Sequence, residues 1–307
     1  MRKYGVGLAG LIIAASAVFG GGIGRAEGQA NAARTGCRHL PSWGDLRAAL
    51  VAARNEANGG LNLDMWGTLV DRDGVVCAVA FTGSDRDDQW PGSRVISAQK
   101  ANTANAFSLR GLALSTANLF TAVQPGGSLF GLQESNPVST LAAYGGSPDR
   151  YGRSNDPMVG ERIGGVNVFG GGLALYDSSH AIVGGVGVSG DTSCADHNIA
   201  YRTRATLRLD YVPAGVSPDP LRKDNIIFDI TPLGDGVPLV GQMAGVSAGG
   251  FGHASCHGYN VAGNTTGAGF AAVLPQNREL RGSCQLPVSS GQFPVASFQW
   301  SVPRCPC

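Results

Sequence analysis

The stretch IVGGVGVSG, residues 182–190, decides the fold. A short apolar run that ends in glycine is typical of a buried strand. The run GGLALY at 171–176 precedes it, and the turn-forming residues DSSH at 177–180 separate the two. Together the three segments predict a β-hairpin. Glycines inside a strand indicate tight turns or the close approach of another backbone, so we expect a helix to pack closely on this strand.

The same glycines match the letters of a dinucleotide-binding fingerprint. Gly185, Gly187 and Gly190 have the required spacing, and Asp210 lies twenty residues after the last of them. That fingerprint needs a parallel β-α-β unit in which the first glycine ends the strand. Because Gly185 and Gly187 are expected inside the return strand of a hairpin, the sequence argues against a dinucleotide site.

The elements around this hairpin follow from periodicity and turn residues. Ser42 and Asp45 resemble a helix capping box, with Asp in place of the usual Glu. Residues 124–164 are rich in Gly, Pro, Ser and Asn and predict a long loop, a kind of segment that is often functional or irregular. Helices are predicted over residues 42–53, 93–110, 116–123 and 192–209, and a first hairpin over 65–81 with its turn at 71–74.

Composition excludes several classes of protein. The chain has 307 residues, of which 43% are hydrophobic and 15% charged, so it can bury a sizeable core and is not typical of a disordered chain. Its net charge is +1. No basic field is therefore present to hold nucleic acid or an anionic membrane.

The N-terminus is typical of an export signal. Arg2 and Lys3 precede an uncharged run at 4–24, and small residues favour cleavage after Ala26. The alternative is a retained membrane anchor, because the uncharged run is long enough to span a bilayer. The apolar centre is short and is followed by three glycines, which favours the signal. We therefore expect an exported protein, periplasmic or secreted, with no membrane span after cleavage.

The cysteines are scattered and include no C-x-x-C pair, which argues against zinc ribbons and thioredoxin-like redox sites. In an exported chain structural disulfides are the default. Since four cysteines lie beyond residue 250, we expect the tail to be bonded to itself or to the main domain, with at least one thiol free or paired between chains. The seven are Cys37, Cys77, Cys194, Cys256, Cys284, Cys305 and Cys307.

Three prolines between residues 213 and 220 mark a boundary after the last predicted helix. Beyond it the chain is rich in Gly, Ser and Pro and holds four cysteines, with one strand predicted at 225–230. The domain layout is a signal peptide (1–26), an N-terminal lead (27–41), a domain (42–210) and a Gly/Pro/Cys-rich C-terminal extension (211–307).

Four segments of the domain resemble, in family order, motifs of the GlcG/HbpS-like family, which is also PduO C-terminal-like. They are VDRDG at 70–74, QKANTA at 99–104, the stretch at 182–190, and DHNIA at 196–200. The resemblance implies an α/β (α+β) fold that is profilin-like, an antiparallel five-stranded sheet with helices on both faces. It also implies a small-ligand-binding protein, often a homo-oligomer, associated with haem binding and sometimes with haem breakdown. The cysteine-rich extension departs from the short family pattern.

Haem needs an apolar slot, cations for its propionates and an axial ligand. By family analogy the helix of Lys100 and Thr103 borders the ligand site, so Lys100 would meet a carboxylate and Thr103 the iron or a bound water. His197 shares one helix face with Cys194 and Tyr201 and is the best-placed histidine for iron. We expect Lys100, Thr103 and His197 to frame one hydrophobic hollow.

Each candidate also has a structural alternative. Lys100 could lie on a solvated helix face, Thr103 could bond back to its own helix, and His197 could merely cap or pack beside a disulfide-bonded Cys194. His180, in a predicted turn, is a further candidate that would be exposed.

The segment 189–193 leads into a helix N-terminus, where free N–H groups favour an anion such as a propionate. The alternative there is an ordinary capping box made by Ser193 and Asp196.

Two motifs in the extension resemble functional motifs but are incomplete. HASCH at 253–257 ends like the haem c attachment motif but lacks its first cysteine, which argues against covalent haem. GVSAG at 245–249 has the letters of a hydrolase nucleophile elbow without a clear strand before it or a helix after it. The sequence therefore predicts an exported haem-binding protein. The alternatives are a haem-degrading, iron-releasing enzyme using the same pocket, disfavoured because no extra base or redox centre is present, and a non-haem interaction protein.

Overall fold

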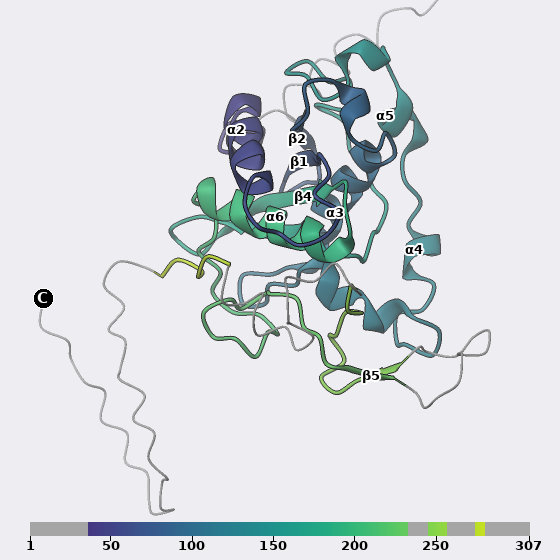
Figure 1. Ribbon diagram of the computed structural model, residues 1–307, viewed down its shortest axis with the longest axis vertical. Helices are drawn as coiled ribbons and strands as arrows, with labels where there is room; N and C mark the ends of the chain where they lie inside the picture. The colour runs from purple at the N-terminus through teal and green to yellow at the C-terminus, as the bar shows by residue number, and fades with distance from the viewer. Residues whose placement is uncertain (1–35, 233–244, 257–273, 280–307) are drawn as a thin grey trace, which may run out of the picture.

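The computed structural model describes residues 36–232, 245–256 and 274–279, so the predicted signal peptide lies outside the described residues (Figure 1). Both predicted hairpins are confirmed. Their strands are β1 (Trp66–Asp71), β2 (Val76–Phe81), β3 (Gly172–Tyr176) and β4 (Ile182–Ser189). They form one antiparallel sheet in the order β2-β1-β4-β3, with the hairpins joined edge to edge where β1 pairs with β4.

Helices cover both faces of this sheet. On one face lies α3 (Ser93–Phe107), where the hydroxyls of Ser97 and Thr68 of β1 are 2.7 Å apart. On the other face α2 (Trp43–Arg54) and α6 (Ser193–Thr206) pack against each other and the strands (Figure 1). Side chains of a strand alternate between faces, which gives the protein two apolar cores, one on each side of the sheet.

Local signals account for where the helices begin. The capping box of α2 is confirmed: the Ser42 hydroxyl accepts from the Asp45 N–H at 3.2 Å, and the Asp45 carboxylate accepts from the Ser42 N–H at 3.0 Å. The box predicted for Ser193 and Asp196 is wrong. Helix α6 is capped one residue earlier, by Thr192, because the Asp196 carboxylate is turned towards other partners.

The glycines of residues 182–190 allow α3 to lie against β4. A Cβ atom at Gly187 would be 1.9 Å from the Ser97 carbonyl oxygen, and one at Gly185 would be 2.3 Å from the Ala101 carbonyl oxygen. The expected close packing of a helix on this strand is therefore confirmed. Because both glycines lie inside an antiparallel strand, a dinucleotide fingerprint is excluded.

The described sheet has four strands, not the five that the family resemblance implies. Beside the edge strand β3 the chain makes one parallel bridge, between Tyr176 and Asp210, with the Tyr176 N–H donating to the Leu209 carbonyl oxygen at 2.9 Å. Helix α6 continues to Thr206. The segment after α6 therefore meets β3 only at Tyr176, the last residue of that strand, and does not pair along the length of the strand.

The predicted long loop contains short helices that cover the outer side of α3. Arg94 of α3 holds this loop, because its guanidinium forms a buried ion pair with Asp156 and donates to the Ala143 carbonyl oxygen at 2.7 Å. The short elements of the connections are η1 (Arg86–Asp88), η2 (Thr116–Leu119), η3 (Thr121–Val123), α4 (Leu132–Ser135), α5 (Thr140–Tyr144) and η4 (Pro148–Arg150).

The described part of the C-terminal extension packs on α6. Arg204, fully buried, donates to the Asp224 carboxylate at 2.5 and 2.8 Å, and the Asn277 amide donates to the Tyr201 hydroxyl at 2.9 Å. The strand predicted at 225–230 is wrong, because the backbone N–H of Ile226 bonds to side chains instead of a neighbouring strand. A two-stranded sheet forms further on, from β5 (Ile230–Pro232) and β6 (Gly245–Ser247).

Two disulfides are present among the described cysteines, as predicted. Cys37 pairs with Cys77 of β2, and Cys194 at the start of α6 pairs with Cys256 of the extension. The second bond links the extension to the main domain. Cys284, Cys305 and Cys307 lie outside the described residues. Within the described ranges, every helix is too short or too polar to cross a membrane.

Candidate functional site

Lys100 is bonded inside the protein. Its side chain is 2% exposed, and its ammonium lies 2.6 Å from the Asp196 carboxylate and 3.3 Å from the Val188 carbonyl oxygen. Asp196 also accepts from the N–H groups of Gly190 and Asp191, at 3.1 and 2.9 Å. Burial raises the pKa of Asp196 to about 6 against the opposing pull of Lys100, which leaves the carboxylate ionised at neutral pH.

These bonds use the backbone N–H groups that the sequence predicted would bind an anion. The free N–H groups expected before the last helix already donate to Asp196, a carboxylate of the protein itself. A neighbouring carboxylate, that of Asp191, accepts from Leu61, Leu63 and Thr192 N–H groups. The helix N-terminus is therefore satisfied internally.

Thr103 makes the back-bond that was its structural alternative. Its hydroxyl donates to the Gln99 carbonyl oxygen at 2.7 Å and accepts from the Asn167 N–H at 3.0 Å. The hydroxyl is fully buried and ties the long loop to α3. Iron ligation by Thr103 stays a prediction, and it requires these hydrogen bonds to rearrange.

His197 is fully buried under the extension. Its Nε2 lies 3.1 Å from Asn225 Oδ1 and 3.2 Å from the Ile226 N–H nitrogen, while Nδ1 has no partner among the described residues. Burial lowers the pKa of His197 to about 4, so the ring is neutral at pH 7. Haem ligation by His197 stays a prediction, and it requires the extension to leave the ring.

His180 lies in the β3–β4 turn with φ +58°. The sequence predicted an exposed side chain, but the ring is half-buried and its Nδ1 lies 2.7 Å from the Tyr211 carbonyl oxygen. The bond fixes the turn against the start of the extension.

The common hollow predicted for Lys100, Thr103 and His197 is wrong. Lys100 and Thr103 belong to α3 and His197 to α6, and these helices lie on opposite faces of the sheet. The two layers meet around the end of the sheet, where Lys100 reaches Asp196 past Gly171. A Cβ at Gly171 would lie 3.0 Å from Asp196 Cβ and 3.2 Å from Lys100 Cδ, so the absent side chain makes room for the ion pair.

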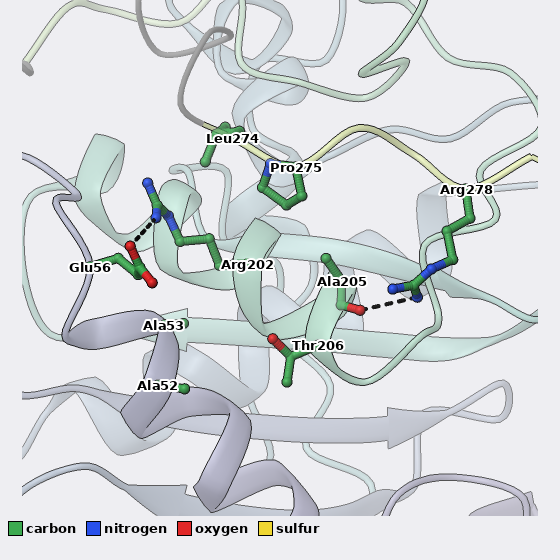
Figure 2. A pocket seen from close by; sticks show the side chains of 9 residues that line it. All are labelled: Ala52, Ala53, Glu56, Arg202, Ala205, Thr206, Leu274, Pro275 and Arg278. Atoms are coloured by element: carbon green, nitrogen blue, oxygen red, sulfur yellow. Dashed lines mark hydrogen bonds and ion pairs between the residues drawn. The ribbon is translucent and has the colours of Figure 1, made fainter.

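Hollows on the described surface include four that are lined by other residues. The largest of these four, about 500 Å³, lies between α2, α6 and the extension (Figure 2). Both of its arginines already bind protein groups: Arg202 pairs with Glu56 at 3.4 Å, and Arg278 donates to the Ala205 carbonyl oxygen at 3.1 Å. Two others, of about 270 and 350 Å³, are lined by charged loop residues and by the hairpin turns.

The fourth, which we call the aromatic hollow, measures about 390 Å³ and lies at the N-terminal end of α3. That volume falls in the usual range of small-molecule sites. It is lined by Trp66, Arg86, Asp87, Pro91, Gly92, Arg94, Val95, Tyr144 and Tyr151.

Two groups of the aromatic hollow are available to a ligand. Tyr144 is 65% exposed, and no described residue bonds to its hydroxyl. Arg86 is held only by an exposed contact of 3.6 Å to Asp87, a kind of ion pair that contributes little and exchanges readily. Arg94 is different, because Asp156 neutralises it and its guanidinium stacks 3.6 Å from the Tyr151 ring centre.

Sequence reasoning missed these residues, although it noted that the long loop carrying Tyr144 and Tyr151 is of a kind that is often functional or irregular. An exposed tyrosine in that loop was the available signal. Nothing local in the sequence brings the loop to Arg86 and to the start of α3.

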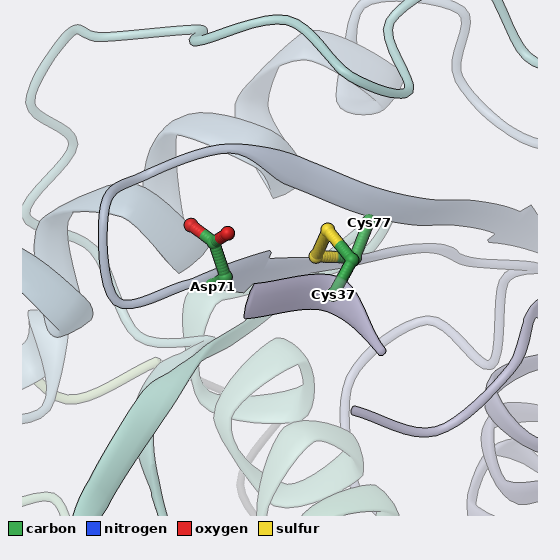
Figure 3. Close-up of side chains that lie close together, drawn as sticks. All are labelled: Cys37, Asp71 and Cys77. Atoms are coloured by element: carbon green, nitrogen blue, oxygen red, sulfur yellow. A yellow bond between two sulfur atoms is a disulfide. The ribbon is translucent and has the colours of Figure 1, made fainter. Parts of the chain in front are cut away.

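One cluster has the composition of a metal site but not its chemistry. Cys37, Asp71 and Cys77 bring ligand atoms within 4.8 Å of one another, the one such group of three among the described residues (Figure 3). The two sulfurs are bonded to each other, and Asp71 Oδ1 accepts from the N–H groups of Asp73 and Val75 at 3.0 and 2.9 Å. The cluster is a disulfide beside a turn-stabilising carboxylate.

The fold defines an α+β protein with an antiparallel sheet between helical layers and an added C-terminal extension. The chain belongs to the HbpS-like family, described as haem degrading protein HbpS-like, whose model matches residues 42–205. The resemblance that the sequence motifs carried is thereby confirmed.

Solved structures similar to this chain include a PduOC–haem complex, with 24% identity over 54% of this chain and 94% of that chain and a TM-score of 0.38. The Klebsiella pneumoniae protein ORFY has 25% identity over 54% of this chain and 90% of that chain, with a TM-score of 0.37. HbpS has 17% identity over 55% of this chain and 91% of that chain, with a TM-score of 0.33. No curated protein matches the chain in sequence.

Proposed function

We propose that this protein is exported and binds haem, acting as a binding protein and not as an enzyme. The observation that carries haem as the ligand is the match of residues 42–205 to a family described as haem degrading. The N-terminal signal and two disulfides support an oxidising compartment outside the cytoplasm.

The aromatic hollow is our proposed haem site. Trp66, Pro91 and Val95 offer apolar surface to the macrocycle, and Arg86 offers a cation to a propionate. Tyr144 would offer its phenol oxygen to the iron, a kind of ligand that haem iron accepts in other proteins. Bound haem would supply an iron centre, and these side chains would hold and orient it.

The competing position is the interior, with His197 or Thr103 on the iron and Lys100 on a propionate. It requires Asn225 and Ile226 to leave His197, and Asn167 to leave Thr103. Each loss exposes a buried polar group that must find a new partner. We therefore favour the aromatic hollow, where the groups are already accessible.

A hemin titration of the mature oxidised protein tests this proposal. We expect a saturable shift of the Soret band, and we expect Tyr144→Phe to change the position of that band and weaken binding at least about tenfold, because the phenol oxygen that would hold the iron is lost. Phe130→Ala is the matched control, since Phe130 is also 65% exposed but does not line the hollow.

Two results would contradict the hollow as the site. One is an unchanged spectrum in Tyr144→Phe together with loss of the shift in His197→Ala or Thr103→Ala, which would favour the interior. The other is no shift in the wild-type protein at micromolar hemin, which would favour a non-haem interaction protein.

The second candidate function is haem degradation, which the family description favours. The lining of the aromatic hollow includes no histidine or cysteine to act as a base or redox centre. We therefore expect the bound Soret band to bleach with peroxide no faster than free hemin, without enzyme-dependent iron release. Faster bleaching that is lost in Tyr144→Phe would establish an enzyme instead.

Export has its own test. We expect the protein in the periplasmic or culture fraction to begin at Glu27, after cleavage behind Ala26. An uncleaved, membrane-bound product would overturn the signal peptide in favour of an anchor. A homo-oligomer is also proposed from the family resemblance, and light scattering of the mature protein measures it.

A further inference from the structure

Three side chains that can bind a metal meet at the Cys37–Cys77 disulfide (Figure 3). Cys37 lies in the turn before α2, Cys77 lies in β2, and Asp71 is the last residue of β1. The two sulfurs and a carboxylate oxygen of Asp71 all lie within 4.8 Å of one another. Bond lengths to zinc of about 2.3 Å for sulfur and about 2.0 Å for oxygen put the ligand atoms of a tetrahedral ion roughly 3.5–3.8 Å apart. A small movement would therefore bring the three atoms onto one ion.

Contacts other than the disulfide hold the three ligands in place. Leu40 is buried in the core that α2 also joins, and its N–H donates to the Cys37 carbonyl oxygen at 3.2 Å. Strand β2 pairs with β1 on either side of Cys77, at Val76 and Ala78. Breaking the S–S bond therefore leaves the turn and the strands next to each other, with the two sulfurs still beside Asp71.

The Asp71 carboxylate has one oxygen available to a cation. Its Oδ1 accepts from the N–H groups of Asp73 and Val75 at 3.0 and 2.9 Å, while Oδ2 makes no hydrogen bond or ion pair among the described residues. Asp71 is 2% exposed. Gly36 lets the turn of Cys37 approach this carboxylate, because a Cβ atom at Gly36 would collide with Oδ2. A buried carboxylate is costly without a partner, and a metal ion would supply one.

The hollow of about 350 Å³ at the hairpin turns gives a reductant and a metal a path to the cluster. Gly36 and Asp71 both line it. Two further carboxylates, those of Asp73 and Asp177, line the same hollow, and its arginine, Arg72, already donates to oxygen atoms of the protein. Carboxylates gathered on one side of a hollow favour the entry of a cation.

We propose that reduction of the Cys37–Cys77 disulfide creates a metal site, in which two thiolates and the Asp71 carboxylate hold zinc or a similar divalent ion and the fourth position is open to water. A dithiol or a phosphine supplies the two electrons, and both cysteines are half-buried and within its reach. The S–S bond breaks and two thiols form, while the dithiol becomes a disulfide or the phosphine takes oxygen from water and becomes its oxide. Zinc then displaces the two thiol protons to solvent.

The donor set suits zinc, which binds thiolates and carboxylates, and three protein ligands with water in the fourth position are the arrangement of catalytic zinc. In the oxidised protein the sulfurs bind each other and are not available to a metal. The redox state of one cysteine pair thus decides whether a covalent bond or a metal ion links the turn before α2 to β2. The site lies apart from the aromatic hollow and does not rest on haem binding.

Cobalt titration of the full mature chain tests this proposal. The protein is reduced with a phosphine, the reductant is removed, and Co²⁺ is added without oxygen. We expect the tightest equivalent to give the d–d bands of tetrahedral Co²⁺ and a thiolate charge-transfer band, which zinc then bleaches. The oxidised protein should show neither.

Two aspartate variants separate the cluster from the charge around it. Asp71→Asn keeps an oxygen that accepts from the turn N–H groups but removes the anionic ligand. It should weaken Co²⁺ binding at least about tenfold, since even changes outside the ligand shell of a metal cost that much. Asp73 lines the same hollow but is not one of the three ligands, so Asp73→Asn is the matched control and should bind as the wild type does.

Alkylation of the reduced wild-type protein covers a variant that fails to fold. Zinc should protect Cys37 and Cys77 from alkylation, as read by mass spectrometry. Cys194 and Cys256 are the internal control, because the same treatment reduces them but they belong to no group of three close ligand atoms among the described residues. They should be alkylated at the same rate with and without zinc.

Three results would each overturn the proposal. One is the absence of tetrahedral bands when Co²⁺ is added to the reduced protein. Another is equal Co²⁺ affinity in Asp71→Asn and the wild type. The third is alkylation of Cys37 and Cys77 that zinc does not slow.

Discussion

Replacing Gly187 with alanine is expected to destabilise the protein by about 3 kcal/mol or more, the upper end of the cost of overpacking a core. The new Cβ would lie 1.9 Å from the Ser97 carbonyl oxygen and 2.5 Å from the Ala101 backbone nitrogen. Both are backbone atoms of α3, which cannot rotate away as a side chain would. The helix must therefore move off the sheet. Urea denaturation followed by circular dichroism measures the change.

Gly111→Ala is the matched control for this prediction. A Cβ at Gly111 meets nothing within 4 Å, and no left-handed backbone conformation opposes a side chain there. We expect a change within about 0.5 kcal/mol, since the substitution mainly restricts the unfolded chain. If Gly187→Ala and Gly111→Ala unfold at the same urea concentration, the close approach of α3 to β4 is not what holds these layers together.

Asp224→Ala should be the second most damaging of these changes, costing about 3–5 kcal/mol. Burial alone would lower the pKa of Arg204. The Asp224 carboxylate stabilises the charged guanidinium and raises that pKa instead. Without that carboxylate, a fully buried cation keeps the Ala174 carbonyl oxygen, at 3.0 Å, as its remaining hydrogen-bond acceptor among the described residues. The extension should also separate from α6, so limited proteolysis of the folded protein should cut residues 211–232 faster.

An exposed ion pair next in sequence to Asp224 is the comparison for the buried pair of Arg204 and Asp224. Lys223 and Glu279 lie 2.8 Å apart, with side chains 19% and 43% exposed, so Glu279→Ala should cost less than about 1 kcal/mol. In the double variant Arg204→Met with Asp224→Leu, much of the lost stability should return, because no charge is left buried. Equal losses for Asp224→Ala and Glu279→Ala would show that the buried pair does not anchor the extension.

Much of the fold could be predicted because its signals are local. The hairpins follow from apolar runs on either side of turn residues, and the start of α2 follows from Ser42 and Asp45 three residues apart. The strand glycines predicted close helix packing for the same reason. Helix α6 shows the limit: the pattern around Ser193 and Asp196 is that of a capping box, but a lysine 96 positions away takes the carboxylate.

The candidate site shows more strongly how little local sequence patterns say about contacts between distant segments. Helical spacing correctly placed Cys194 and His197 on one helix, but it says nothing of which face of the sheet that helix covers. Lys100 and His197 were therefore assigned to one hollow, although the sheet lies between their helices. Tyr144 and Arg86 were missed because the loop and the start of α3 meet only when the chain is folded.

The sequence by itself determined the strands, the main helices, the family and the presence of disulfides, since these depend on interactions within a few residues or on composition. Tertiary structure decided which cysteines pair, which carboxylate neutralises each buried cation, and which side chains stay open to a ligand. The physical reason is that burial and bonding between segments such as Cys194 and Cys256, 62 residues apart, depend on how whole layers pack, which no local pattern encodes.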